Sequence, residues 1–376
     1  MKVVTAIDSF KGSMTSMEAG FAAAEGIHRV DADAEVQVRP LADGGEGTVE
    51  ALVAGMNGKT EHVKVTGPLG EPVICEYGII ESTKTAVIEM AGAAGITQVP
   101  DEKRNPLYTT TYGVGEVIKD AIEKGCRRFI VGIGGSATND GGVGMLQALG
   151  YAFLDKDGKQ VLPGARGLKD ITEITAAYVI PELAECKFRV ACDVTNPLCG
   201  ELGCSSIYGP QKGATPEMIQ DMDQWLGAYA ELAKERFPKA DAKYPGTGAA
   251  GGMGFAFLTF TDAVLESGIN IVLDEAKLED YIKDADLVIT GEGRMDGQTA
   301  MGKAPVGVAK LAKKYGKKVI AFAGAVQRDA RACNDAGIDA FFPILRGVVT
   351  LEDAMKNENA KQNLADTAEQ VIRLMK

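Results

Sequence analysis

Apolar and polar positions follow a βα rhythm at the two ends of the chain. The apolar runs that predict strands there lie at residues 3–8, 35–39, 286–290, 318–324 and 340–345. The stretches that predict helices lie between and after them, at residues 16–29, 46–56, 303–315, 329–336 and 351–374. Two early and three late βα units together predict one doubly wound α/β domain with a five-stranded parallel sheet.

The middle of the chain has a different pattern. Three β-like runs at residues 61–66, 72–80 and 85–90 are separated only by short turns, which predicts an antiparallel meander. A helix at 113–124 and a strand at 129–133 follow. The middle of the chain is therefore predicted to form a mixed-sheet α/β domain.

Together these patterns predict two domains. A discontinuous doubly wound domain comprises residues 1–60 and 276–376, and it is interrupted by an inserted mixed α/β domain of residues 61–275. Residues 241–254 are the most glycine-rich stretch, and we expect a mobile or substrate-shaping loop there. We expect the active site in the cleft between the domains, because small-molecule sites commonly lie at domain interfaces.

Five of the apolar runs stop abruptly at clusters of glycine, acidic and hydroxyl residues. These five segments lie at residues 3–13, 38–48, 129–142, 188–197 and 286–297. Open α/β sheets bind ligands beyond the carboxyl ends of their strands, so the five segments predict one large polar site. Its backbone amides, carboxylates and few cations suit phosphoryl transfer better than other common chemistries.

Composition narrows the classes of partner. The 376 residues carry a net charge of −12, which argues against nucleic acid and against anionic membrane surfaces. No apolar run approaches the length of a bilayer span, and Asp8 interrupts the N-terminal apolar run, so we expect a cytoplasmic protein without a signal peptide. The odd count of seven cysteines favours reduced thiols.

The histidines and cysteines suggest neither a metal cluster nor a histidine base. Cys192, Cys199 and Cys204 have a spacing that matches no common zinc pattern, and the only histidines, His28 and His62, are far away in sequence. A carboxylate is therefore the expected general base.

One glycine-rich segment supports a competing interpretation. Gly132, Gly134 and Ala137 fit a dinucleotide fingerprint after a strand, and Asp155 falls where a ribose-binding acid would lie. This pattern would indicate an NAD(P)-dependent oxidoreductase acting on a small hydroxy acid. However, the strand follows a meander, Asp140 stands where a pyrophosphate would bind, and Asp155 lies in an apparent hairpin turn. A P-loop motif is absent from the sequence.

The strand-end residues have both functional and structural interpretations. Asp8 at a strand end with Lys11 nearby suits an anionic or polyol substrate, but the acid could equally cap a turn. Asp43 and Glu46 could face a ligand or serve as helix N-terminal residues. Asp193 could accept a proton or bind Mg²⁺, or could form an Asx-turn before Pro197.

Arg294 and Asp296 present the same choice. The guanidinium group of Arg294 could bind a carboxylate or phosphate, or could form a surface salt bridge within its own loop.

Six segments together resemble the class I glycerate kinases. They read D-S-F-K-G-S, A-D-G-G-E-G-T, G-I-G-G-S-A-T-N-D-G-G, C-D-V-T-N-P-L-C-G, G-P-Q-K-G-A and I-T-G-E-G-R-M-D, in the family's order, and the likeness extends from residue 1 to about 350. The resemblance implies a flavodoxin-like domain interrupted by a second α/β domain. It also implies phosphorylation of D-glycerate by ATP with Mg²⁺ in glyoxylate or sugar-acid breakdown, with 2-phosphoglycerate as the expected product.

The resemblance and the chemistry of the reaction suggest a role for each group of residues. Asp193, Lys11 and Arg294 are the candidate catalytic residues, with Asp193 as the base. The candidates for substrate binding are Asp8, Ser9, Ser13, Asp43, Glu46 and Asp296. The candidates for nucleotide binding are Gly134, Gly135, Ser136, Thr138, Asn139 and Asp140. Asp193 and Asp296 are the candidate Mg²⁺ ligands. A non-catalytic hydroxy-acid sensor remains a further alternative, and the oligomeric state, monomer or homodimer, stays open.

Overall fold

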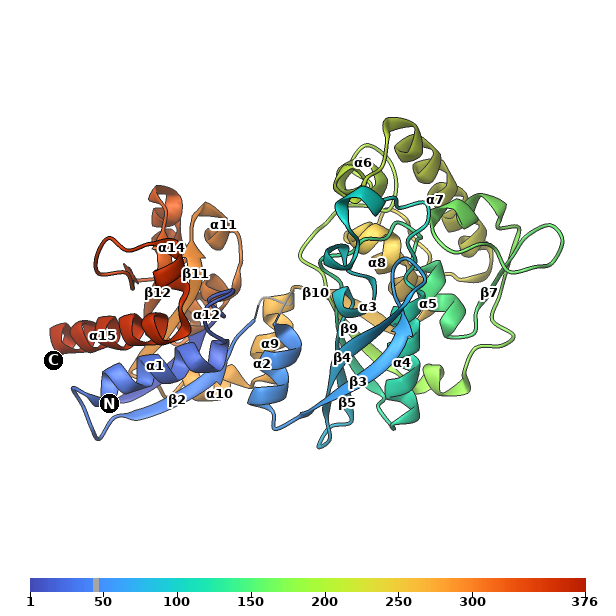
Figure 1. Ribbon diagram of the computed structural model, residues 1–376. Coiled ribbons are helices and arrows are strands. Elements are labelled where there is room, and N and C mark those ends of the chain that lie inside the picture. Colours follow the sequence, from blue (N-terminus) through green and yellow to red (C-terminus); the bar gives the residue numbers. More distant parts are fainter. Residues whose placement is uncertain (43–46) are drawn as a thin grey trace. The chain divides into compact units, whose positions relative to one another are not determined.

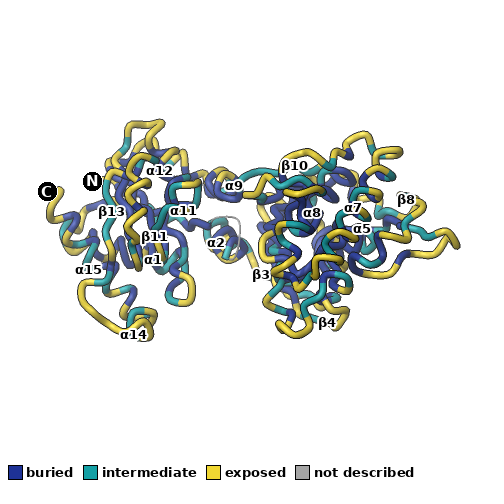
Figure 2. Tube along the Cα trace, turned by 90° about the horizontal axis from the view of Figure 1, so that it is seen from above, coloured by how far each residue is buried: buried dark blue, intermediate teal, exposed yellow. Residues whose placement is uncertain are grey.

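A computed structural model describes residues 1–42 and 47–376 and divides the chain into two compact units. Unit 1 comprises Met1–Asp43, Glu50–Asn57 and Ile269–Lys376, and unit 2 comprises Gly44–Val49 and Gly58–Gly268. Each unit has a largely buried interior of its own (Figure 2). Within the described residues, no helix is both long enough and apolar enough to cross a membrane.

Unit 1 is built on a five-stranded parallel sheet with the order β2-β1-β11-β12-β13 (Figure 1). Its strands are β1 (Lys2–Ile7), β2 (Glu35–Pro40), β11 (Leu287–Met295), β12 (Lys318–Val326) and β13 (Ala340–Pro343). This is the flavodoxin-like order, in which the direction of winding reverses between β1 and β11. The predicted doubly wound sheet is therefore confirmed.

Helices α1 (Ser16–His28) and α15 (Asn357–Met375) pack side by side on one face of this sheet (Figure 1). Thr15 and Glu18 form a capping box that begins α1. The two helices approach closely at Gly26, where a Cβ atom would lie 2.1 Å from the carbonyl oxygen of Ala365. Helix α12 (Ala304–Lys314) contacts β1, β11 and β12 and belongs to the opposite layer.

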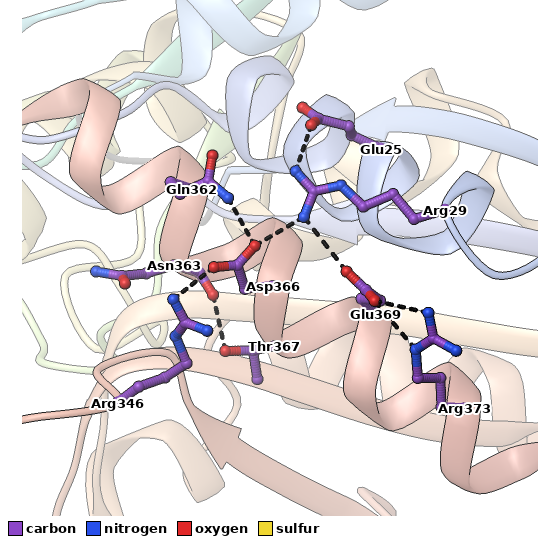
Figure 3. Close-up of polar contacts among 9 residues, drawn as sticks. All are labelled: Glu25, Arg29, Arg346, Gln362, Asn363, Asp366, Thr367, Glu369 and Arg373. Atoms are coloured by element: carbon purple, nitrogen blue, oxygen red, sulfur yellow. Dashed lines mark hydrogen bonds and ion pairs between the residues drawn. The ribbon is translucent and has the colours of Figure 1, made fainter.

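A charged network ties α15 to its surroundings (Figure 3). Asp366 on α15 accepts a hydrogen bond from Arg29 at 2.7 Å and pairs with Arg346 at 2.5 Å. Arg29 also contacts Glu25 on its own helix and Glu369 on α15. The network therefore links the end of α1, helix α15 and the segment after β13.

Two predicted helices of unit 1 differ from the structure. The segment predicted at 351–374 forms two helices, α14 (Leu351–Met355) and α15, because Lys356 between them has an extended backbone. The segment predicted at 329–336 is a 3₁₀ turn (Arg328–Arg331) followed by the short α13 (Ala332–Asp335). The remaining helices of this part of the chain are α2 (Thr48–Gly55), α9 (Gly268–Glu275), α10 (Leu278–Ile282) and α11 (Gly297–Ala300).

Unit 2 contains a mixed six-stranded sheet with the order β10-β9-β6-β5-β4-β3. Its strands are β3 (Lys59–Thr66), β4 (Pro72–Ile80), β5 (Thr85–Glu89), β6 (Arg128–Gly132), β9 (Lys187–Ala191) and β10 (Ala263–Glu266). The β3-β4-β5 meander is antiparallel, and the neighbours from β5 to β10 are parallel. The predicted meander and mixed sheet are confirmed, whereas β10 was not predicted.

Helices and short segments surround the core of unit 2. They are α3 (Ala91–Ala94), α4 (Tyr112–Glu123), α5 (Val143–Ala148), α6 (Cys204–Tyr208), α7 (Pro216–Arg236) and α8 (Ala249–Phe260). A hairpin of β7 (Ala152–Leu154) and β8 (Glu173–Thr175) and five 3₁₀ turns complete the unit, the turns lying at Ile96–Gln98, Asp101–Lys103, Ala165–Asp170, Pro181–Glu185 and Pro210–Lys212.

The glycine-rich residues 241–254 form a loop only in part. Residues 246–249 are buried, and α8 includes a kink at Ala250, Gly251 and Gly252, which all have positive φ. A Cβ atom on Gly251 would lie 2.0 Å from the carbonyl oxygen of Thr138. The glycines therefore permit close packing against the loop after β6, and the expectation of a loop throughout this stretch was wrong.

Candidate active site

A pocket of about 380 Å³ lies at the carboxyl edge of the sheet in unit 1. The segments that follow β1 and β13, the ends of β11 and β12, and parts of α14 and α15 supply its walls. The polar and charged lining residues are Asp8, Ser9, Lys11, Ser13, Glu292, Arg294 and Lys303. Asp8 follows Ile7, which is paired in register with Gly291, so the pocket lies at the point where the winding of the sheet reverses. This is the position at which doubly wound sheets bind ligands.

The charges in this pocket suit a small anion. Lys11, Arg294 and Lys303 are cationic, and Asp8 and Glu292 are acidic, which leaves one positive charge in excess. Asp8 accepts a hydrogen bond from the backbone N–H of Ser9 at 2.7 Å, and Glu292 accepts one from the hydroxyl of Thr299 at 2.5 Å. Each carboxylate therefore has a fixed hydrogen-bond partner, and the three cationic residues line the same pocket.

The hydroxyl group of Ser13 is notable because it is buried at the pocket wall without a hydrogen-bond partner in the described part of the chain. The backbone on either side is fixed, since Ser13 N–H donates to Phe10 at 2.8 Å and Ser13 C=O accepts from Asn357 at 2.8 Å. A buried hydroxyl without a partner is costly, and a polar ligand in the pocket would relieve that cost.

The structure brings together five of the predicted site residues, namely Asp8, Ser9, Lys11, Ser13 and Arg294. Lys303 also lines the pocket, at the N-cap of α12, and its place at a helix start after Arg294 suggested an anion site from the sequence alone. Asp43 and Glu46 lie outside the described residues.

Asp296 does not line the pocket, and its side chain has a local structural role. It is the N-cap of α11, where it accepts a hydrogen bond from Gln298 N–H at 3.0 Å, and it pairs with Arg294 at 3.4 Å. The salt bridge with Arg294 is the structural alternative that the sequence offered, and the cap adds a second local role. Binding of substrate or metal by Asp296 stays a prediction.

A second cluster lies at the carboxyl edge of the sheet in unit 2. Strands β6 and β9 are neighbours, with Gly132 opposite Ala191, so residues 133–142 and 192–197 leave the sheet at the same edge. Gly134 and Gly135 are exposed there, and the mostly buried Ser136 follows them. In the described part of the chain, the backbone N–H groups of these three residues have no acceptor. Consecutive amides of this kind can bind an anion.

The later residues of the same segment face the interior. The Asn139 amide donates to Ser205 at 2.9 Å, and Asp140 accepts from the N–H and hydroxyl of Thr111 and from the N–H groups of Gly142 and Gly144. Burial raises the pKa of Asp140, although these hydrogen bonds oppose the shift. Thr138, Asn139 and Asp140 are thus buried, and their predicted role in nucleotide binding stays a prediction.

The helix that follows this segment begins well after the exposed glycines. Helix α5 begins at Val143, seven residues after Ser136, so the exposed glycines do not open it. Any anion at Gly134 and Gly135 would be bound by free amides rather than by the N-terminus of a helix.

Asp155 occupies a turn, as the sequence suggested against the dinucleotide interpretation. Its carboxylate accepts hydrogen bonds from the N–H groups of Asp157 and Lys159, each at 2.9 Å. These hydrogen bonds stabilise the tip of a hairpin. Asp155 therefore has a structural role that requires no ribose as a partner.

Sequence analysis missed Lys212. This residue is 2% exposed, and its ammonium group donates to the hydroxyl of Ser136 at 2.8 Å and to the carbonyl of Thr138 at 2.5 Å. It belongs to the G-P-Q-K-G-A segment, where it is the only charged residue. A single charged residue in an otherwise uncharged segment could have indicated a functional role. The sequence could not reveal that Lys212 is buried beneath the loop after β6.

Asp193 follows β9 and is exposed. Its carboxylate accepts hydrogen bonds from Ser267 and from the N–H of Gly268, which begins α9. Within the described residues, no group of three or more His, Cys, Asp or Glu side chains could hold a metal ion by itself.

A family model described as the glycerate kinase family matches residues 3–376. The chain belongs to the glycerate kinase family. This confirms the resemblance found in the sequence, and membership makes the chain an enzyme of the kinase class.

Individual relatives agree with this assignment. The chain is 51% identical over 375 residues to the glycerate kinase of Haemophilus influenzae, covering 100% of this chain and 99% of the relative. It is 48% identical over 372 residues to the glycerate 2-kinase of Escherichia coli, covering 98% of each. The crystal structure of a proposed glycerate kinase 2 from Salmonella typhimurium LT2 matches with a TM-score of 0.93 and 47% identity, covering 100% of this chain and 98% of that one.

Proposed function

We propose that the protein transfers the γ-phosphoryl group of ATP to D-glycerate, giving 2-phosphoglycerate and ADP. The observation that carries this proposal is the pocket in unit 1, where three cations, two fixed carboxylates and the buried hydroxyl of Ser13 line a space suited to a small hydroxy acid. Family membership supports the same substrate, and the Escherichia coli relative named glycerate 2-kinase supports the position phosphorylated.

The pocket contains partners for each group of D-glycerate. Arg294 is proposed to bind the carboxylate through its planar guanidinium group, with Lys11 as a second cation. Asp8, Ser9 and Ser13 are proposed to bind the hydroxyl groups. Lys303, at the same wall, adds positive charge where the transferred phosphoryl group carries negative charge.

The nucleotide is proposed to bind in unit 2. The free N–H groups of Gly134, Gly135 and Ser136 would donate to phosphate oxygens. Asp193, at the same edge of the sheet, is the proposed base. In the transfer, the attacking hydroxyl oxygen bonds to the γ-phosphorus, the bond to the bridging oxygen of ADP breaks, and Asp193 accepts the hydroxyl proton.

Mg²⁺ would enter as the MgATP complex. Proteins commonly bind such an ion through one or two carboxylates, with substrate phosphates and water as its other ligands. Asp193 fits this limited role because it is exposed and acidic beside the proposed phosphate site. The ion would neutralise phosphate charge. In-line transfer also needs both substrates within bonding distance, so the proposal requires the two units to bring them together during turnover.

The direct test is ADP release by the purified protein with MgATP and D-glycerate, with L-glycerate and no acceptor as controls. The expected product is used by enolase without added phosphoglycerate mutase, which distinguishes 2-phosphoglycerate from 3-phosphoglycerate. A product that requires the mutase would overturn the assigned position. Absence of glycerate-dependent ADP would overturn the proposed reaction.

A further inference from the structure

Lys212 is a buried cation that forms no ion pair with a described residue, although Asp140 lies close enough to favour its charged form. It ends the 3₁₀ turn Pro210–Lys212, and its side chain extends beneath the loop after β6. No carboxylate of the described residues forms an ion pair with its ammonium group. Burial of an ammonium group outside an ion pair is unfavourable, so this arrangement is expected to serve a purpose other than stability.

The two hydrogen bonds of Lys212 span the turn that presents the free amides. One acceptor is the hydroxyl of Ser136, and the other is the carbonyl of Thr138. On its other side the loop is held by hydrogen bonds from Ile96 N–H to Gly135 C=O and from Ala137 N–H to Ala94 C=O. Within residues 134–138, the hydrogen bonds of the described chain thus use carbonyls, the Ser136 hydroxyl and the N–H of Ala137. The N–H groups of residues 134–136 are left for a ligand.

We infer that Lys212 is the positioning residue of a phosphate subsite, holding the loop after β6 so that its consecutive amides face the phosphates of the nucleotide. This inference rests on the proposed function. The ammonium group also places a positive charge directly beneath the loop, and this charge would attract a bound anion. The third N–H of the ammonium group remains available for water or for the anion.

The surroundings of the ammonium group agree with this role. Burial lowers the pKa of Lys212 to about 8, and the two titratable groups that oppose the shift are Cys204 and Asp140. Burial raises the pKa of Cys204 to about 11. An anion bound at the loop would favour the charged form of Lys212, so nucleotide binding and protonation of this lysine are expected to be linked.

The first test compares Lys212→Met with the wild-type protein. Methionine has a similar length but neither charge nor donors, so the dissociation constant for ADP, measured by calorimetry, is expected to rise about tenfold or more. The KM for D-glycerate is expected to stay within about twofold, since that substrate binds elsewhere. Lys212→Arg should recover part of the affinity, and Lys234→Met, at an exposed site on α7, is the matched control. Unchanged ADP affinity in a folded Lys212→Met protein would overturn the inference.

A second measurement does not depend on the folding of that variant. Between pH 7.5 and 9.5, ADP is fully ionised and Cys204 stays protonated, so wild-type ADP affinity is expected to fall about tenfold as Lys212 loses its proton. Ser136→Ala should weaken ADP binding but keep this pH dependence, because it retains the ammonium group. Constant wild-type affinity over this range would overturn the inference.

The two proposals fail separately. If the wild-type protein binds ADP but does not phosphorylate glycerate, the proposed reaction is wrong, and the effect of Lys212→Met on ADP affinity still decides the role of Lys212. If glycerate is phosphorylated and Lys212→Met binds ADP normally, only the role of Lys212 is wrong.

Discussion

Asp193 accepts a hydrogen bond from the hydroxyl of Ser267 at 2.8 Å and another from the N–H of Gly268 at 3.1 Å. Gly268 is the first residue of α9 and the last of unit 2, so this carboxylate anchors the chain where it passes from one unit to the other. The same carboxylate is the proposed base. A structural and a chemical role therefore coincide in one side chain, and they can be separated by substitution.

Asp193→Asn is expected to lower kcat by about 10²- to 10⁴-fold, the range typical of a lost general base. The asparagine oxygen can still accept the two hydrogen bonds, so the anchor should persist. Ser267→Ala is the matched variant, because it removes one of those bonds and keeps the carboxylate, and it should change kcat by less than about threefold. Steady-state kinetics of both variants provide the measurement. Similar losses in the two would show that Asp193 acts only as an anchor.

Arg294→Ala is expected to raise the KM for D-glycerate by about 10- to 100-fold, since hydrogen bonds to a charged group contribute about 1.5–3 kcal/mol. Arg294→Lys keeps the charge but not the planar pair of donors, so its KM for D-glycerate should lie between those of the wild-type protein and of Arg294→Ala. Arg328→Ala, at an exposed position in the same unit, is the control. If Arg294→Ala leaves the KM for glycerate unchanged and raises the KM for ATP, Arg294 binds the nucleotide rather than glycerate.

Ser13→Ala is expected to change stability and substrate affinity in opposite directions. The Ser13 hydroxyl is buried without a described partner, so its removal should leave the free energy of unfolding unchanged or raise it by up to about 1 kcal/mol. The KM for glycerate should rise by about tenfold. Denaturant unfolding and kinetics test the two parts.

Ser16→Ala provides the contrast. The Ser16 hydroxyl donates to Ile7 C=O at 2.6 Å and accepts from Leu41 N–H at 2.7 Å. Loss of these bonds should lower stability by about 1–3 kcal/mol. Destabilisation of similar size in Ser13→Ala would mean that the Ser13 hydroxyl has a partner in solution.

Asp366→Asn is expected to lower the melting temperature by about 1–3 °C at neutral pH, because the residue joins Arg29 and Arg346 in one network (Figure 3). Burial raises the pKa of Asp366, but hydrogen bonds from Arg29 and Gln362 and the charge of Arg346 lower it overall. A lowered pKa stabilises the fold above the ordinary value near about pH 4 and ceases to do so as pH falls.

The difference in melting temperature between Asp366→Asn and the wild-type protein should therefore be smaller at about pH 3 than at neutral pH. Scanning calorimetry at these two pH values provides the measurement. Glu358→Gln, exposed on the same helix, is the control. A difference that stays constant with pH would exclude an electrostatic origin.

Local patterns were sufficient for much of the fold. The alternation of apolar runs and amphipathic stretches predicted the parallel sheet of unit 1 and the meander of unit 2. This was possible because the periodicity of a strand or helix depends on residues that are close together in the sequence. The break at Lys356 and the strand β10 were missed, and β10 depends on pairing with β9, which is distant in the sequence.

The pocket in unit 1 was partly foreseeable for the same reason. Acids, hydroxyls and cations directly after apolar strands predicted Asp8, Lys11, Ser13 and Arg294 as lining residues, because the carboxyl ends of parallel strands share one edge. Asp296 has the same sequence context but turns into a helix cap. Composition at a strand end thus predicts where a site lies better than it predicts which side chain faces it.

By itself, the sequence determined the family, the order of elements and the edge of each sheet at which polar residues gather. Tertiary structure alone decided that Asp140 is an interior acceptor and that Lys212 lies beneath a loop 74 residues away in sequence. The reason is physical: residue type sets which hydrogen bonds a group can form, whereas burial, which sets their strength and the pKa, depends on chain segments that meet only after folding.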